Sequence, residues 1–359
     1  MAEENGTVKK AGWGCLGCGL GLFLSIFLLI GLVGLALYGL GTAISGCESS
    51  AGIGSGSSCD PDSLEEEYVL GRKDASLPRI AVVEVRGVIA SGEGPFSGNI
   101  ADSELICTRI RRAAADSRVK ALIVNLNTPG GEVVAADEIY AEIKRFRQRT
   151  GKTAVAMMNT MAASGGYYVA AACSPIVANK LTVTGSIGVI ISTYNYRGLF
   201  EKVGLQSEVY TSGKMKDMLN GARTRTPEEI QIVRQLVDRT CNEFIRIVAE
   251  SRRIPAEKIR SSEIGDGRIF DGARAKELGL VDTLGYFRDA VEIAAGKAGL
   301  KRDSYMVIRY KEPFSLGRLF SLLSSSFSGR PVNVTLNGIP GGRTFVPERG
   351  MLYYLPANY

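Results

Sequence analysis

The chain has 359 residues, of which 45% are hydrophobic and 22% charged, and a net charge of +6. This balance is typical of a globular protein with one large or two small domains, and the scattered basic residues predict no nucleic-acid partner. The sequence contains no histidine, which excludes Ser–His–Asp and Cys–His mechanisms and zinc sites of the HExxH type. Acid–base chemistry near neutral pH would then need a carboxylate, lysine, cysteine or tyrosine with a shifted pKa.

Residues 1–15 precede an apolar segment, 16–40, that contains no charged residue over 25 positions. A helix of that length exceeds the ~30 Å hydrocarbon core of a bilayer, so we predict a transmembrane helix. Lys9 and Lys10 come just before it, whereas the first charged residues after it are acidic. The positive-inside rule then places residues 1–15 in the cytoplasm. We expect a single-pass protein of the cell (inner) membrane whose remaining chain is extracytoplasmic, with the lipid bilayer as a partner.

Two alternatives for this segment stay open. A cleaved signal peptide would have a shorter apolar region and a small-x-small cleavage site. The run Ile44-Ser45-Gly46-Cys47 resembles a bacterial lipoprotein processing site, at which cleavage would leave a lipid on Cys47. Mass analysis of the mature N-terminus would distinguish these outcomes.

The seven cysteines form no obvious framework. Cys15 and Cys18 make a lone CxxC without a partner pair, and neither a metal nor a cofactor is expected. Cys47 and Cys59 flank a Gly/Ser-rich stretch and could form a disulfide on an oxidising side of the membrane. The remaining three cysteines are expected as small buried hydrophobic residues: Cys107, Cys173 and Cys241.

Residues 41–77 are predicted to be a flexible linker, because their first part is rich in Gly and Ser. Beyond Pro78, strands and helices alternate. The predicted strands are 80–85, 119–126, 153–158, 176–178 and 206–211, and the predicted helices are 99–114, 132–149, 164–172 and 227–251. This alternation indicates an α/β fold with a parallel sheet, whose strand ends direct their loops toward one site. The folded domain is expected at 78–300, followed by a C-terminal extension at 301–359.

The first loop with chemical potential is Pro129-Gly130-Gly131, between a predicted strand and a predicted helix. Its glycines allow positive φ and close backbone approach, and amides near a helix N-terminus favour developing negative charge. An oxyanion hole has these requirements. A plain strand-to-helix turn would explain the motif equally well.

The second loop contains Ser164 in the run MAASGGYY. A serine among small residues at a strand-to-helix junction is expected to have an exposed hydroxyl and room for an acyl group, although serine is also a common helix N-cap. Two further turns follow, Thr184-Gly185-Ser186 and Ser212-Gly213-Lys214-Met215-Lys216-Asp217.

The order NTPGGEV, MAASGGYYVAAA, TGSIGV and SGKMKD resembles the bacterial signal peptide peptidase family in its short form with one catalytic domain. The resemblance covers roughly residues 78–300, and four motifs in order are far more specific than any one. It implies the α/β fold of the Clp protease subunit and of crotonases, a spiral of βαβ units. Asn127-Thr128 and Cys173 depart from the usual residues of the motifs.

The resemblance also implies roles for individual residues. Ser164 would be the nucleophile and Lys216 the general base of a Ser–Lys dyad. Gly131 and Gly165 would donate the oxyanion-hole hydrogen bonds, and Ser186 would hold the lysine amine in place. The missing histidine agrees with such a dyad, since a desolvated lysine can have a pKa several units below ~10.4 and act as a neutral base.

Lys214 is a rival base, because an extended segment would point Lys214 and Lys216 to the same side. The position in the family motif favours Lys216, and a solvated surface lysine is the plain alternative. The resemblance further implies a homo-oligomer, an octamer, in which neighbouring subunits can supply the serine and the lysine. The sequence does not show whether one chain or two provide the dyad.

The expected activity is that of a membrane-bound serine endopeptidase that degrades signal peptide remnants and other short apolar peptides. Two other functions are compatible with parts of the sequence. A crotonase-like acyl-CoA enzyme would share the fold and the paired amides, but such enzymes commonly use carboxylate bases. A membrane scaffold without catalysis would not need Ser164, Lys216 and Gly131.

Overall fold

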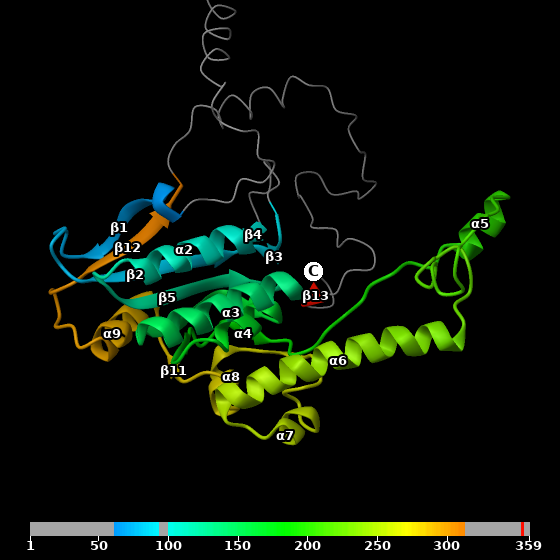
Figure 1. Cartoon of the computed structure of the whole chain (residues 1–359). Coiled ribbons are helices and arrows are strands. Elements are labelled where there is room, and N and C mark those ends of the chain that lie inside the picture. Colours follow the sequence, from blue (N-terminus) through cyan, green and yellow to red (C-terminus); the bar gives the residue numbers. More distant parts are fainter. Residues whose placement is uncertain (1–60, 93–99, 313–352, 355–359) are drawn as a thin grey trace, which may run out of the picture. The chain divides into compact units, whose positions relative to one another are not determined.

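The strands of the chain form two sheets, seen in the computed structural model, which describes residues 61–92, 100–312 and 353–354 (Figure 1). The larger sheet has the order β1-β12-β2-β5-β7-β8-β11, with β9 paired to β7 and β10 paired to β9. Its strands are β1 (Glu65–Gly71), β2 (Arg79–Arg86), β5 (Val119–Thr128), β7 (Thr153–Ala163), β8 (Ile176–Ala178), β9 (Val183–Gly185), β10 (Ile269–Phe270), β11 (Thr283–Leu284) and β12 (Met306–Lys311).

The smaller sheet has the order β13-β6-β3-β4. Its strands are β3 (Val88–Ala90), β4 (Ile100–Asp102), β6 (Gly131–Glu132) and β13 (Tyr353–Tyr354). The helices are α2 (Ser103–Ala115), α3 (Val133–Thr150), α4 (Gly165–Ala170), α5 (Arg197–Val203), α6 (Pro227–Arg252), α7 (Ala256–Arg260), α8 (Gly272–Glu277) and α9 (Phe287–Lys297). A 3₁₀ turn occupies Pro61–Ser63.

The central strands β2, β5 and β7 are parallel to one another. β5 reads VKALIVNLNT and is buried along most of its length. Such a continuous apolar run is typical of a parallel strand that is covered on both faces. The mixed α/β fold expected from the alternating pattern is therefore confirmed.

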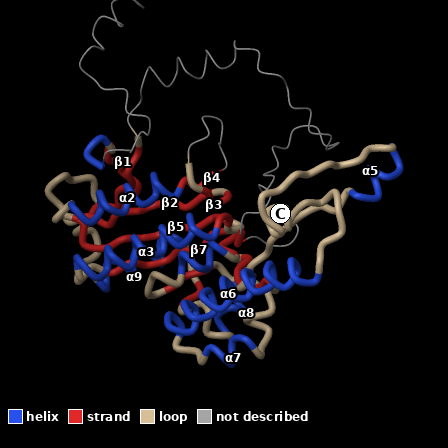
Figure 2. Tube along the Cα trace, turned by 45° about the vertical axis from the view of Figure 1, so that its right-hand side comes forward, coloured by secondary structure: helices blue, strands red, loops and turns tan. Residues whose placement is uncertain are grey.

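Side chains of these strands alternate between two hydrophobic clusters. Val83, Leu122 and Ala154 pack in the cluster that includes residues of α2, α3, α4 and α6. Ile123 and Val155, next to them in sequence, pack on the opposite face against α9. Fully burying one such aliphatic side chain contributes about 1.5–3 kcal/mol, so the two clusters fix the strands and the loops that follow them. Figure 2 shows β2, β5 and β7 side by side.

Several predicted boundaries differ from the structure. The helix predicted at 99–114 begins only at Ser103, because β4 occupies the residues before it. Asp102 is the N-cap, and its carboxylate accepts a hydrogen bond from Glu104 N–H. The strand predicted at 206–211 is wrong, since those residues are exposed and none of them lies in a strand. No strand within the described ranges pairs with them, and an unpaired strand is not stable.

Three described strands lie outside the range 78–300 expected for the domain: β13 of the smaller sheet and two strands of the larger sheet. β1 belongs to the segment expected as a linker, and β12 belongs to the expected C-terminal extension. They pair with each other antiparallel, and β12 pairs parallel with β2, so both are part of the larger sheet. The folded unit is therefore wider than 78–300.

The predicted membrane helix at 16–40, the disulfide between Cys47 and Cys59 and the processing site at Cys47 lie outside the described residues. Within the described ranges, no helix is both long enough and apolar enough to cross a bilayer. Cys107 and Cys173 are buried free thiols, as predicted, whereas Cys241 is only half-buried. Burial raises the pKa of Cys107 and of Cys173 to about 12.

Candidate active site

The carboxyl ends of β5, β7 and β9 meet at one edge of the larger sheet. The parallel register places Thr128 beside Ala162 and Ala163 beside Gly185. The loops that follow these three strands therefore start next to one another. Open α/β sheets bind their ligands at this edge.

Ser164 occupies the turn between β7 and α4 with φ 53° and ψ −116°, a region that non-glycine residues rarely adopt. Its N–H donates to Gly185 O at 2.8 Å, and its carbonyl accepts from Tyr168 N–H at 3.0 Å. The exposed hydroxyl predicted from the sequence is wrong for the single chain, because the side chain is fully buried under the packed strand ends. The hydroxyl has no hydrogen-bond partner among the described residues. A strained backbone and a buried unpaired hydroxyl both cost free energy, and such features gather at functional sites.

The two tyrosines after Ser164 hold this turn in place. Tyr167 donates its hydroxyl to Leu280 O at 2.9 Å, and Tyr168 donates to Asp137 Oδ1 at 2.7 Å. The Tyr168 ring packs against Phe244 of α6 with ring centroids 5.2 Å apart. The GGYY run therefore anchors α4, and with it the serine, to other parts of the domain.

The loop that contains Gly131 is fixed by close backbone contacts. Thr128 Oγ1 accepts a hydrogen bond from Gly130 N–H at 3.0 Å, and Gly130 has φ 108°. A Cβ atom on Gly131 would lie 1.8 Å from the Ile89 carbonyl oxygen, so only glycine fits there without moving the backbone. Thr128 also fills the space beside Gly166, where an added Cβ would lie 2.8 Å from Thr128 Cγ2.

These contacts bring the two glycine-containing loops together. α4, which begins at Gly165, packs against β5 and β6, and β6 begins at Gly131. The outer edge of β6 pairs with β13 in an antiparallel register, Tyr353 with Glu132 and Tyr354 with Gly131. An extended chain segment therefore lies along β6, with its backbone at Gly131.

Ser186 follows β9 and lies close to the serine turn. Its neighbour Gly185 accepts the Ser164 N–H, and Ser186 N–H donates to Arg268 O at 2.7 Å. Ser186 has φ 51° and is 5% exposed. The structure therefore gathers four of the five site residues predicted from sequence in one region: Gly131, Ser164, Gly165 and Ser186.

Lys216 is not part of this arrangement within the single chain. It is exposed, and no hydrogen bond or ion pair of its amine is found among the described residues. Lys214 differs, because its amine donates to Glu228 Oε2 at 2.7 Å and this contact raises its pKa. The carboxylate favours the protonated ammonium form of Lys214, whereas a general base must be neutral, and this distinguishes the two lysines.

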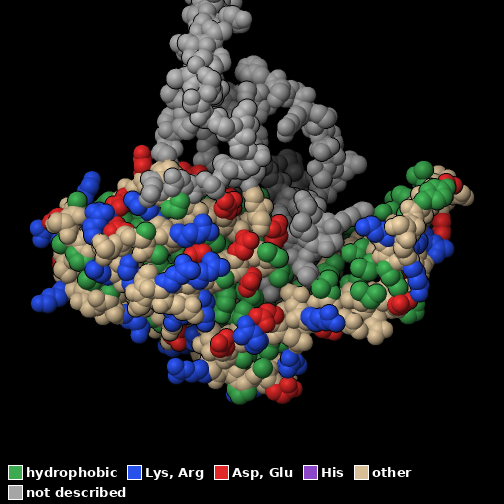
Figure 3. All heavy atoms as spheres, in the orientation of Figure 1, with side chains coloured by type: hydrophobic (Ala, Val, Ile, Leu, Met, Phe, Trp, Pro, Cys, Tyr) green, Lys and Arg blue, Asp and Glu red, His purple; other side chains and the backbone are tan. Residues whose placement is uncertain are grey.

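The segment around Lys216 is mostly exposed. Between residues 190 and 226, only Gly221 is buried. Hydrophobic side chains nevertheless lie on the surface around α5, as Figure 3 shows. They include Tyr194, Leu199, Val203, Leu205, Val209 and Tyr210.

The sequence patterns did not reveal the threonines that hold the site. Thr128 is fully buried between the Gly131 loop and α4, and Thr184 Oγ1 donates to Ala162 O at 2.7 Å. Both threonines tie neighbouring strand ends together just before a site residue. Their position directly before the PG and GS turns is the one sequence feature that marks them.

The sequence profile of peptidase family S49 matches residues 146–301. A putative protease from Synechocystis sp. is 38% identical over 246 residues, which cover 68% of this chain and 84% of that protein. A putative signal peptide peptidase from Enterococcus faecium is 37% identical over 239 residues, which cover 66% of this chain and 68% of that protein.

Among solved structures, a ClpP1 variant from Listeria monocytogenes aligns with 58% of this chain and 94% of that chain. The sequence identity is 17% and the TM-score is 0.37. A score of that size does not establish a shared fold.

Proposed function

Because the chain belongs to peptidase family S49 and is a serine peptidase, we propose that it cleaves peptide bonds through an acyl-enzyme on Ser164, with Lys216 as general base. The observation that carries this proposal is the state of Ser164, a strained and buried serine whose hydroxyl has no partner among the described residues. A nucleophile on a sharp strand-to-helix turn has this geometry in other hydrolases. Membership of a peptidase family favours this function over an acyl-CoA enzyme or a scaffold.

In the proposed reaction the neutral Lys216 amine takes the proton of Ser164. The serine oxygen attacks the carbonyl carbon, and the oxyanion accepts hydrogen bonds from the amides of Gly131 and Gly165. The protonated amine then gives its proton to the leaving nitrogen as the peptide bond breaks. Water, deprotonated by the same lysine, attacks the acyl carbon of the acyl-enzyme. The ester bond to Ser164 then breaks, the second product leaves, and the lysine returns its proton to the serine oxygen. The Ser186 hydroxyl orients the Lys216 amine by a hydrogen bond.

A second copy of the chain supplies the base in this proposal. Among the residues that the structure describes, the buried Ser164 hydroxyl and the exposed Lys216 amine have no partner, so these two groups are not paired with each other there. The exposed apolar side chains around α5 support a contact between copies that would cover them. We propose a homo-oligomer, by family resemblance an octamer, with the Clp-like spiral of βαβ units in each subunit.

The peptide substrate would bind as an added strand. The outer edge of β6 already accepts an extended segment in β13, which pairs at Gly131. A substrate in the same place would bring its main chain to the proposed oxyanion donors, and main-chain hydrogen bonds would provide affinity without much side-chain selection. This suits signal peptide remnants and other short apolar peptides, released from a bilayer in which residues 16–40 anchor the enzyme with its catalytic domain outside the cytoplasm.

The test uses the full chain and three variants. We expect Ser164→Ala and Lys216→Ala each to lower peptidase activity by several orders of magnitude, and Lys214→Ala to keep most of it. A fluorophosphonate probe should label the wild type and not Ser164→Ala. Full activity in Lys216→Ala together with loss in Lys214→Ala would overturn the assignment of the base.

Mixing the two inactive chains tests whether subunits share sites. Ser164→Ala and Lys216→Ala chains, unfolded together and reassembled, should recover part of the activity, since some sites would pair an intact serine with an intact lysine. Each variant reassembled alone is the control. No recovery in mixed oligomers would place both residues in one chain.

A further inference from the structure

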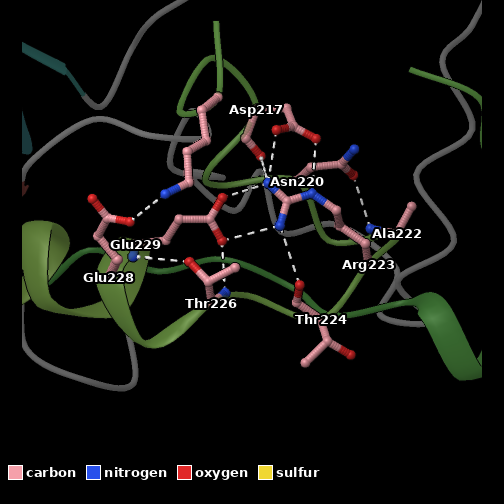
Figure 4. A network of polar contacts seen from close by, with 9 residues as sticks. Asp217, Asn220, Ala222, Arg223, Thr224, Thr226, Glu228 and Glu229 are labelled. Atoms are coloured by element: carbon pink, nitrogen blue, oxygen red, sulfur yellow. Dashed lines mark hydrogen bonds and ion pairs between the residues drawn. The ribbon is translucent and has the colours of Figure 1, made fainter. Parts of the chain in front are cut away.

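Arg223 joins the loop that contains Lys216 to the first turn of α6 (Figure 4). Its Nε and Nη2 donate to the two carboxylate oxygens of Asp217 at 2.8 and 2.7 Å. Its Nη1 donates to Glu229 Oε2 at 3.0 Å, and Nη2 also reaches Glu229 Oε1. One guanidinium group therefore binds both carboxylates, and the bidentate geometry fixes its orientation.

Backbone contacts complete the unit around this arginine. Lys216 N–H donates to Gly213 O at 3.0 Å, and Asn220 N–H donates to Asp217 O at 2.8 Å. Glu229 is also part of the capping box of α6, in which its Oε2 accepts from Thr226 N–H at 2.7 Å. The loop and the helix terminus are thus held together by paired side chains although the segment is mostly exposed.

The two carboxylates around Arg223 stay ionised over the whole working range. Hydrogen bonds from Arg223 hold the pKa of Glu229 at about 2 and lower that of Asp217. The Glu229 side chain is only 2% exposed and Asp217 only 19%. Water screens such charges poorly, so each carboxylate depends on its cation.

We propose that Arg223 is a positioning residue for the general base: it fixes the Lys216 loop on α6 and neutralises the two carboxylates that would otherwise keep the Lys216 amine protonated. The proposal rests on the proposed role of Lys216. A lysine acts as a base only when neutral, and an unpaired negative charge nearby favours its ammonium form.

Several other charged groups on the neighbouring segments have partners of their own. Glu228 of α6 accepts from Lys214, and Arg197 of α5 donates to Glu201 and to Thr224. Arg225 donates to Thr193 Oγ1 at 2.8 Å. On the serine side the proposed partners of the amine are hydroxyls, and nearby Arg268 is paired with Asp266 and Glu263. Asp217 and Glu229 are thus the carboxylates whose charge depends on Arg223.

The test is the pH dependence of kcat/KM in the full-length enzyme. In Arg223→Gln the acid limb should move to higher pH by about one unit, with about a tenfold loss at neutral pH that shrinks in more alkaline buffer. Adding Asp217→Asn should move the limb back toward the wild-type position. Arg223→Lys keeps the positive charge but loses the planar, bidentate guanidinium. The acid limb of its pH profile should therefore stay near the wild-type position, while its maximal kcat/KM falls.

Arg246→Gln is the matched control, because Arg246 also bridges two carboxylates, Glu243 and Glu250, farther along α6. Its profile should not shift. If kcat/KM of Arg223→Gln falls by the same factor at every pH, Arg223 has a structural role only and the proposal is overturned. Wild-type kcat/KM in Arg223→Gln would also overturn it.

Two further variants distinguish the possible reasons for a negative result. If Arg223→Gln does not fold, Asp217→Asn alone decides, since removing one carboxylate should move the acid limb to lower pH and an unmoved limb would refute the proposal. Lys216→Ala distinguishes failure of the proposed function from failure of the proposed role of Arg223. Activity retained in Lys216→Ala contradicts the proposed function, whereas an inactive Lys216→Ala with an unshifted Arg223→Gln profile contradicts only the role of Arg223.

Discussion

At the scale of single residues, Ser164 gives up stability for reactivity. Its buried hydroxyl has no partner among the described residues, and leaving a buried polar group unpaired costs about 1–3 kcal/mol. We therefore expect Ser164→Ala to unfold at the same denaturant concentration as the wild type or a higher one, although it is inactive. Chemical denaturation followed by fluorescence measures this. Destabilisation by more than about 1 kcal/mol would show that the hydroxyl has a partner in the folded enzyme.

Gly131 is constrained by space rather than by conformation. An alanine there would place its Cβ against the Ile89 carbonyl oxygen, so β3 or β6 must move. We expect Gly131→Ala to lower kcat by about 10²-fold or more, the usual loss when an oxyanion donor is misplaced. Gly296→Ala is the control, because Gly296 is exposed in α9 and nothing lies within 4 Å of an added Cβ. It should keep full activity and gain about 0.5–1 kcal/mol of stability.

Sequence patterns located the glycine turns and Ser164 because chemistry restricts the residue types there. They could not tell that Ser164 is fully buried or that Lys216 is exposed, since burial depends on elements far away in the chain. The sequence also could not show that Lys214, unlike Lys216, forms an ion pair among the described residues. The partner is Glu228, 14 residues after Lys214, at a helix terminus whose contact with the loop is tertiary.

At the scale of elements, the β1–β12 pair depends on ionised carboxylates. Arg309 and Lys311 of β12 donate to Glu67 of β1, and these hydrogen bonds lower the Glu67 pKa to about 2. Because the folded pKa lies below the unfolded one, this contribution is present above about pH 4.5 and is lost as pH falls toward 2.

We therefore expect stability to fall less steeply in Glu67→Gln than in the wild type between pH 4.5 and 2. Thermal unfolding across that range measures it. The difference should shrink at high salt, since these groups are partly exposed. Parallel curves for the two proteins would show that Glu67 does not contribute to acid sensitivity.

The central elements followed from the sequence, whereas the peripheral ones did not. β2, β5, β7 and β8 are buried apolar runs that a local pattern marks clearly. β1 reads EEEYVLG and is half polar, so only its pairing with β12 makes it a strand. The opposite error occurred at 206–211, where a strand was predicted but no strand in the described part of the chain pairs with these residues.

At the scale of the whole molecule, the proposed assembly depends on exposed apolar side chains. Leu199 is 60% exposed and Leu205 56% exposed on the segment that contains the proposed base. We expect Leu199→Asp to lower the oligomer mass and the activity together, while the unfolding midpoint of the domain stays unchanged. Sedimentation velocity and peptide hydrolysis on one sample measure this.

Gln206→Asp adds the same charge to the same segment without removing an apolar group, and it should leave mass and activity unchanged. Activity per chain should also fall on dilution if sites are shared between copies. A fully active monomer of Leu199→Asp would contradict the shared site.

β13 occupies the edge of β6 at which the peptide substrate is proposed to bind. On the proposed function, a substrate reaches β6 only in the fraction of molecules in which Tyr353–Tyr354 has left it. The apparent KM is then the intrinsic value divided by that fraction, and a covalently tethered strand competes at an effective concentration on the order of millimolar. Scarce peptides would rarely displace it, whereas peptides that accumulate would. The enzyme would thus cleave little at low peptide concentration and become active mainly when its substrate accumulates.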